Sequence, residues 1–197
     1  MTEQEKMARG DWYDANHDPC LLEMRAKAEQ LCFELNQLPP MAKDRRAALL
    51  RRILPYAAED VEILSPFYTD YGTNCHIGGK TFINHNAYFM DGALITIGER
   101  CFIGPNCGIY TALHPMHWQD RAKGLERAVP VTIQDDVWLG ADVKVLPGVT
   151  IGRGCVVGAG SVVTRDLPAG WLAVGNPCRP LRPITQADFI EQDKEAE

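Results

Sequence analysis

Bulky apolar residues recur at every sixth position through the middle and late parts of the chain. The residues that share this count are Ile97, Ile103, Ile109, Ile133, Leu139, Val145, Ile151, Val157 and Val163. A six-residue period is typical of a solenoid in which three short β-strands form one coil and equivalent side chains stack about one strand spacing apart. The period therefore predicts a mainly β fold, a left-handed parallel β-helix of hexapeptide repeats.

The repeat is interrupted once without losing its phase. Ile109 and Ile133 lie 24 positions apart, a multiple of six, so residues 115–130 replace regular repeats and predict an inserted loop. Earlier in the chain the count slips by two at Ile95 and Thr96, which predicts that the coil near Asp91 protrudes from the regular path.

Small residues mark two further positions of the hexapeptide. Glycine stands at the second position of several repeats, and we expect a tight corner there, with a backbone conformation that other residues disfavour. These glycines are Gly78, Gly98, Gly104, Gly140, Gly152 and Gly158. Cysteine stands four residues after the apolar anchor in four repeats. A free thiol packs there as a small apolar group, and the pattern predicts neither a disulfide nor a zinc site. These cysteines are Cys75, Cys101, Cys107 and Cys155.

The amino-terminal segment has a different pattern. Apolar residues at helical spacing, with a Pro39-Pro40 step between two groups of them, predict a small α-helical domain over residues 1–60 that caps the first coil. The β-helix is expected over 61–182, and a tail over 183–197 whose last residues, 191–197, are charged and predicted to fray.

Composition excludes two classes of partner. The formal net charge of -6 argues against a nucleic-acid partner. No run of about 18 apolar residues predicts a membrane span, and residues 1–10 lack the apolar stretch of a secretory signal, so we expect a cytoplasmic protein.

His114 is the best candidate for a chemical role, because it ends the last turn before the inserted loop. Imidazole titrates near neutrality and can take a proton from an alcohol that attacks an acyl group. A structural histidine at a loop hinge is the alternative that the residue by itself leaves open.

Motifs spread over nearly the whole chain carry a resemblance. They are TALHPMH at 111–117, VWLG at 137–140, LPGVTIG at 146–152, GAGSVVT at 158–164 and GNP at 175–177, together with EKMARG at 5–10 leading to Tyr13. With these motifs the chain resembles the maltose and galactoside O-acetyltransferases of the hexapeptide-repeat superfamily. The resemblance implies transfer of an acetyl group from acetyl-CoA to a hydroxyl of a sugar, with no metal required.

The resemblance also implies roles for individual residues. His114 would be the general base in a direct attack without an acyl-enzyme, and Asn84, Asp91 and Asp70 would hold the acceptor. The chain departs from galactoside members, which have Asp-Asp where it has Asp91-Gly92 and Ser where it has Asp70. The implied coenzyme contacts are Trp138, Ala141, Ala159, Thr164, Arg165, Arg179 and Arg182. Family members are homotrimers with active sites between neighbouring prisms, and the loop would reach over the adjacent subunit.

Other functions of the same scaffold remain open. A carbonic anhydrase of the γ type needs three histidines across a trimer interface, and the spacing of His85, His114 and His117 does not match it. A non-enzymatic trimeric scaffold would leave His114 and the polar residues unexplained. Serine acetyltransferases have a long amino-terminal helical domain that is missing here, whereas an acceptor of the antibiotic or nodulation-factor type stays an alternative to a sugar.

Overall fold

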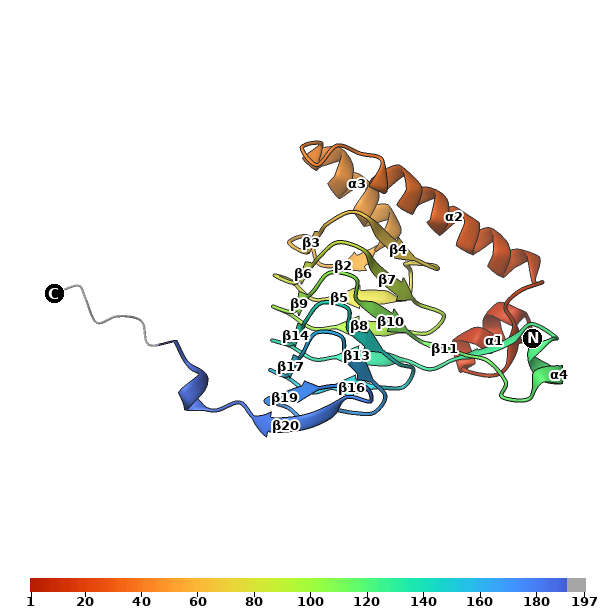
Figure 1. The fold of residues 1–197 in the computed structure, drawn as a ribbon. Helices are drawn as coiled ribbons and strands as arrows, with labels where there is room; N and C mark the ends of the chain where they lie inside the picture. The colour runs from red at the N-terminus through yellow and green to blue at the C-terminus, as the bar shows by residue number, and fades with distance from the viewer. Residues whose placement is uncertain (191–197) are drawn as a thin grey trace.

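The computed structural model describes residues 1–190, and the segment 191–197 that was predicted to fray lies outside the described residues. Stacked parallel coils form a three-faced prism with helices at one end (Figure 1). The predicted fold class, mainly β with stacked hexapeptide coils and an N-terminal helical part, is confirmed.

Each face of the prism is one parallel sheet. The first face contains β2 (Tyr56–Ala57), β5 (Cys75–Ile77), β8 (Ile95–Ile97), β13 (Val131–Ile133) and β16 (Thr150–Ile151). The second contains β3 (Glu62–Ile63), β6 (Phe82–Ile83), β9 (Phe102–Ile103), β14 (Trp138–Leu139), β17 (Val156–Val157), β19 (Trp171–Val174) and the antiparallel β20 (Arg179–Pro183). The third contains β4 (Phe67–Thr69), β7 (Ala87–Met90), β10 (Gly108–Tyr110), β15 (Lys144–Val145) and β18 (Val162–Val163). A 3-10 helix, η1 (Gln186–Asp188), follows β20.

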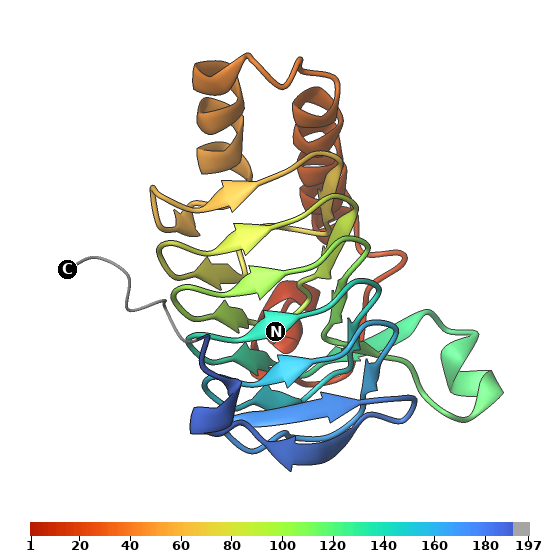
Figure 2. The same ribbon diagram turned by 60° about the vertical axis from the view of Figure 1, so that its left-hand side comes forward.

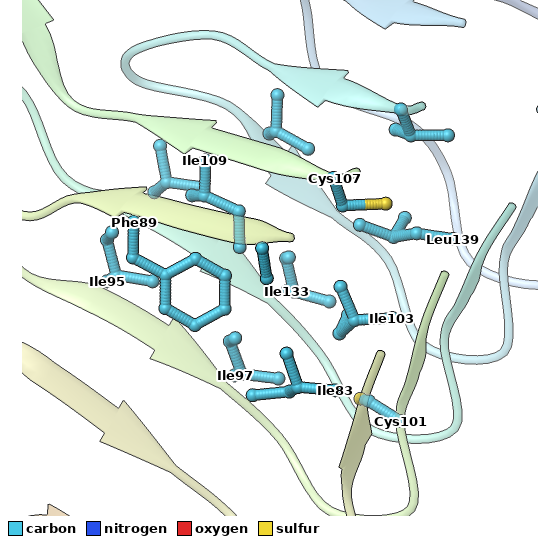
Figure 3. Close-up of a cluster of buried hydrophobic side chains, with 14 of the residues drawn as sticks. Ile83, Phe89, Ile95, Ile97, Cys101, Ile103, Cys107, Ile109, Ile133 and Leu139 are labelled. Atoms are coloured by element: carbon cyan, nitrogen blue, oxygen red, sulfur yellow. The ribbon is translucent and has the colours of Figure 1, made fainter. Parts of the chain in front are cut away.

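The apolar residues at every sixth position form the core of the prism. Ile97 pairs with Ile133, and Ile133 with Ile151, so residues on the count stack directly above one another. Their side chains point into the prism (Figure 3), and those on the predicted count are at most 2% exposed. Removing each such side chain from water contributes about 1.5–3 kcal/mol. The four cysteines named above are buried and free, as predicted.

The explanation expected for the second-position glycines is wrong. Gly98 and Gly104 do not have a positive φ; instead, a Cβ on Gly104 would lie 2.7 Å from the carbonyl carbon of Gly140 in the next coil. Close approach of neighbouring coils therefore requires glycine at this position. The left-handed conformation occurs two residues later, for example at Arg100 (φ 56) and Asn106 (φ 60).

Two helices cover the first coil. In Figure 1, α2 (Pro19–Asn36) and α3 (Lys43–Ile53) cross the end of the prism. The Asn36 side chain accepts from the Phe67 amide at 2.9 Å and donates to its carbonyl at 3.0 Å, which satisfies backbone groups on the edge strand β4. Arg46 of α3 donates to the Ile63 carbonyl at 3.2 Å. The helices thus protect an edge that would otherwise be open to pairing.

The inserted loop leaves the prism as a ribbon. β11 (Ala112–Leu113) and β12 (Leu125–Ala128) are antiparallel, and α4 (Trp118–Arg121) lies between them. On its other edge β12 pairs with β1 (Tyr13–Asp14), which follows α1 (Glu3–Arg9). The ribbon and α4 project from one corner of the prism (Figure 2). The amino-terminal segment therefore contacts the inserted loop as well as the first coil.

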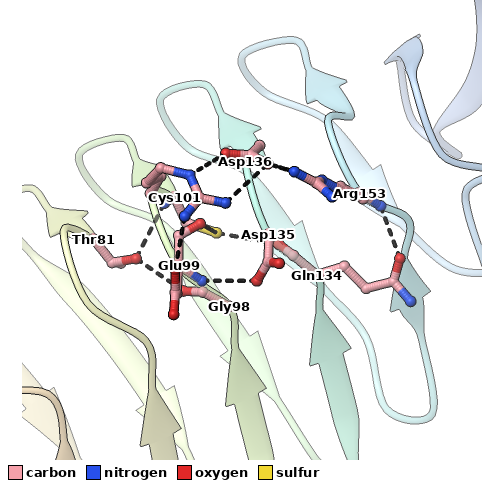
Figure 4. A network of polar contacts seen from close by, with 9 residues as sticks. Thr81, Gly98, Glu99, Cys101, Gln134, Asp135, Asp136 and Arg153 are labelled. Carbon is pink, nitrogen blue, oxygen red and sulfur yellow. Dashed lines mark hydrogen bonds and ion pairs between the residues drawn. The ribbon is translucent and has the colours of Figure 1, made fainter.

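A ladder of ion pairs runs along the corner between the first and second faces (Figure 4). Asp136 accepts from Arg100 Nε at 2.6 Å and from Arg153 Nε at 2.9 Å, joining three successive coils.

No helix within residues 1–190 has the length and apolar character needed to cross a membrane.

Candidate active site

The predicted site residues lie at two different corners of the prism and on its second face. The corner between the third and first faces carries the inserted loop, and we call it the loop corner (residues 70–74, 91–94, 111–130, 146–149 and 164–166). It holds His114, Asp70, Asp91, Thr164 and Arg165. The corner between the second and third faces we call the alanine corner (residues 84–86, 104–107, 140–143 and 158–161). It holds Asn84, Ala141 and Ala159, whereas Trp138, Arg179 and Arg182 lie on the second face.

His114 is held at the start of the ribbon in a defined tautomer. Its Nδ1 lies 2.9 Å from the carbonyl oxygen of Leu125. Because a carbonyl only accepts, Nδ1 carries the proton and Nε2 of the neutral ring presents its lone pair. The side chain is 47% exposed, so Nε2 is open to a substrate.

Glu126 lies beside that lone pair. Its Oε2 is 3.8 Å from His114 Nε2, and the Glu126 side chain is 14% exposed. Its Oε1 accepts a hydrogen bond from the phenol of Tyr13, which is fully buried and directly opposite Glu126 in the β1–β12 pairing. Burial, and then the hydrogen bond to Glu126, raise the pKa of Tyr13 well above its usual range, so the phenol stays a neutral donor. Sequence reasoning missed both residues as parts of the site.

Asp91 faces the interior of the coil. It is fully buried, and its Oδ1 accepts from Thr69 Oγ1 at 2.7 Å and from the Tyr71 amide at 2.8 Å. Its Oδ2 accepts from the Asn74 amide at 3.2 Å. This carboxylate, expected to contact the acceptor, holds the widened corner together instead and is shielded from solvent. The protrusion predicted near Asp91 is this corner, where the coils have twenty residues instead of eighteen: Ile77 pairs with Ile97, whereas Ile133 pairs with Ile151.

Asp70 lies in a cleft of about 320 Å³ between α2 and the third face. Its lining is Arg25, Glu29, Cys32, Tyr68, Thr69, Asp70 and Tyr88. The Tyr88 phenol donates to Asp70 Oδ1. Burial raises the pKa of Asp70 in spite of that hydrogen bond. The cleft therefore offers two carboxyl groups, two phenols and one guanidinium to a polar ligand.

The alanine corner presents small side chains and exposed backbone. Successive coils are joined there by a bond of 2.8 Å from the Gly160 amide to the Ala141 carbonyl, and Ala159 is exposed. Asn84 Oδ1 accepts from the His85 amide at 2.8 Å. Trp138, on the adjoining face, is 53% exposed and pairs in register with Phe102 and Val156.

The arginines predicted to bind the coenzyme differ in their partners. Arg182 forms a bidentate pair with Asp188, at 2.8 and 2.6 Å, and holds the pKa of that carboxyl well below its usual range. Arg179 Nη1 donates to the Cys178 carbonyl at 2.7 Å, and Arg165 is exposed. These cationic side chains could bind phosphate groups of a coenzyme. To do so, Arg182 would have to release the carboxylate of Asp188.

Comparison with known proteins assigns the family. The maltose acetyltransferase hexapeptide capping motif matches residues 6–57, the bacterial transferase hexapeptide (six repeats) matches 130–165, and the hexapeptide repeat of succinyl-transferase matches 94–113. SAR2635 of Staphylococcus aureus (strain MRSA252), whose name places it among acetyltransferases, is 52% identical over 93% of this chain and 92% of its own length. The chain belongs to the hexapeptide-repeat acetyltransferases.

Solved structures also support the assignment of this chain to the hexapeptide-repeat acetyltransferases. A maltose O-acetyltransferase from Clostridium difficile 630 is 40% identical, with a TM-score of 0.91 over 94% of this chain and 99% of that one. A galactoside acetyltransferase in complex with coenzyme A is 33% identical, with a TM-score of 0.90 over 100% and 99%. The resemblance found in the sequence is therefore confirmed.

The histidines of this acetyltransferase are spread over the fold. His76 lies against Tyr56 with the two rings tilted by 41°, His117 stacks on Trp118, and His17 Nδ1 lies 3.0 Å from Asp14 Oδ1. Within residues 1–190, no three His, Cys, Asp or Glu side chains converge as metal ligands. The three-histidine arrangement of the carbonic anhydrases is thus not formed by the described part of one chain.

Proposed function

We propose that this acetyltransferase uses acetyl-CoA to acetylate a hydroxyl of a sugar, with His114 as the general base. The observation that carries the proposal is the hydrogen bond from His114 Nδ1 to the Leu125 carbonyl, which leaves Nε2 free to accept a proton. General-base catalysis of this kind contributes about 10²–10⁴-fold.

The proposed reaction is a direct transfer. His114 Nε2 takes the proton of the acceptor hydroxyl while that oxygen attacks the thioester carbon, and the C–S bond breaks. The protonated ring then returns the proton to the departing thiolate, so no covalent enzyme intermediate is needed. Glu126, 3.8 Å away, stabilises the imidazolium that forms in between.

For acetyl-CoA, the exposed backbone around Ala141 and Ala159 would accommodate the pantetheine arm, and Arg165, Arg179 and Arg182 would neutralise the phosphates, with Thr164 and Trp138 nearby. The coenzyme A complex of the galactoside acetyltransferase supports this expectation by similarity. The coenzyme supplies the activated acetyl group, and the chain supplies its orientation and the proton acceptor.

A homotrimer would complete the site. In one chain His114 is at the loop corner and Asn84, Ala141 and Ala159 are at the alanine corner, on opposite edges of the third face. Met116 and Trp118, two positions apart on the loop, are 95% and 64% exposed and offer apolar surface to a neighbouring subunit. Packing the loop corner of one subunit against the alanine corner of the next would cover them and join the two sets of residues.

Release of the coenzyme A thiol tests the proposal. The acceptors are glucose, maltose, a galactoside, serine and chloramphenicol. We expect turnover that depends on acetyl-CoA and on a sugar. Turnover with chloramphenicol alone would move the acceptor to the antibiotic class, and no turnover together with no acetyl-CoA binding would contradict the enzymatic function.

A further inference from the structure

We propose that Glu126, fixed by Tyr13, selects acceptors that carry a second hydroxyl on the carbon next to the one acetylated. The inference rests on the proposed function and adds the acceptor class. It concerns a carboxylate on β12, a strand that belongs to the projecting ribbon and not to the coil.

One carboxylate oxygen of Glu126 is fixed and the other is available. Oε1 accepts from the Tyr13 phenol, whereas no hydrogen bond from within residues 1–190 reaches Oε2. No buried side-chain oxygen or nitrogen in this described part lacks a partner, so Oε2 is open to solvent. A carboxylate that is 14% exposed loses much of its hydration and binds a donor strongly when one arrives.

Gly92 makes room for this arrangement. A Cβ at Gly92 would lie 3.1 Å from the Tyr13 hydroxyl, 3.2 Å from Ala128 Cβ and 3.4 Å from Glu126 Oε1. A larger side chain at position 92 would push the phenol or the carboxylate away. The glycine, the buried phenol and the carboxylate therefore fit together as one unit.

Two hydrogen-bond acceptors face the same space. His114 Nε2 presents a lone pair, because Nδ1 donates to the Leu125 carbonyl, and carboxylate oxygen Oε2 of Glu126 lies 3.8 Å from Nε2. They cannot bond to each other, but they match two hydroxyls on adjacent carbons. One hydroxyl gives its proton to Nε2 and is acetylated, while the other keeps its proton and donates to Oε2. A sugar ring supplies such pairs, whereas an isolated alcohol does not.

The test combines a change in the enzyme with a change in the acceptor. Wild type and Glu126→Gln are assayed by thiol release with methyl α-glucopyranoside and its four monodeoxy analogues. In wild type, one deoxy analogue that retains the acetylated hydroxyl should lose about tenfold or more in kcat/KM, because the charged acceptor is left unpaired. In Glu126→Gln the same deoxygenation should lower kcat/KM much less than in wild type. In wild type, the deoxygenation should change KM more than kcat.

Control variants separate selection from a structural effect. Tyr13→Phe should weaken the same preference, and Asp120→Asn, an exposed loop carboxylate paired with Lys123 at 2.8 Å, should leave it unchanged. A penalty of equal size in wild type and Glu126→Gln would overturn the inference and leave the proposed function intact. Wild-type turnover of serine or chloramphenicol but of no glucoside would also overturn it. Absence of all turnover and of acetyl-CoA binding would instead mark failure of the proposed function.

Discussion

Tyr13 and Glu126, 113 positions apart in sequence, lie opposite each other in an antiparallel pair, and the phenol of one donates to the carboxylate of the other. This pair ties the amino terminus to the inserted loop. The helical segment therefore does more than cap the first coil, because it also fixes a carboxylate beside the proposed base.

Loss of the Tyr13 hydroxyl should destabilise the protein. Tyr13→Phe leaves a partly buried carboxylate with one fewer donor, and we expect the free energy of unfolding to fall by about 1–3 kcal/mol in urea titrations. Tyr56→Phe is the matched control, since Tyr56 is 59% exposed and its ring lies against that of His76 at a tilt of 41°. Equal stability of the two variants would mean that the phenol contributes no net stabilisation.

Substitutions at Gly104 and Asn106 separate two physical effects, the close approach of neighbouring coils and the left-handed backbone conformation. Gly104→Ala places a Cβ 2.7 Å from the next coil and should cost about 1–3 kcal/mol in unfolding free energy. Asn106→Gly, at φ 60 on the same corner, should be nearly neutral or slightly stabilising, because glycine adopts this conformation without strain. Urea unfolding of both variants checks the assignment, and the reverse order of stabilities would refute it.

The six-residue count is sufficient to predict the stacked coils and their core, since burial of Ile97, Ile133 and Ile151 follows from a strictly local repeat. It does not show that Asp91 turns inward, because that depends on amides of the coil before it. Nor does it reveal the contact between Tyr13 and Glu126, which joins two short strands outside the repeat. The motif around His114 predicted the position of the proposed base, but not the carbonyl that sets its tautomer.

Asp70 should make stability decrease with rising pH. Burial raises its pKa above the ordinary 3.8, so the folded protein holds this proton more tightly than the unfolded chain does. Its contribution to the free energy of unfolding therefore falls as the pH rises from about 3.8 through the folded-state pKa, and the cost persists above it. Asp70→Asn still accepts from Tyr88 but does not ionise.

The difference in unfolding free energy between Asp70→Asn and wild type isolates this effect from other carboxyl groups. It should shift in favour of the variant between about pH 3 and pH 7, measured by urea unfolding at several pH values. A difference that is flat, or that shifts in favour of wild type, would show that Asp70 is not held in this way.

A site shared between subunits predicts complementation. His114→Ala and Asn84→Ala should each be nearly inactive alone, because each removes one half of every site. Unfolding the two together and refolding them as mixed trimers should restore activity, since some interfaces then combine an intact His114 with an intact Asn84 from the neighbour. If the mixture is no more active than the separate variants, the two residues do not meet across an interface.

The role of His114 is tested most directly by comparing His114→Ala with His117→Ala, three residues further along the same exposed loop. With the best sugar acceptor, the account predicts a kcat reduced by about 10²–10⁴-fold for His114→Ala and a nearly unchanged kcat for His117→Ala, with acetyl-CoA binding retained in both. A His114→Ala enzyme that binds acetyl-CoA and turns over within a few-fold of His117→Ala would contradict the account.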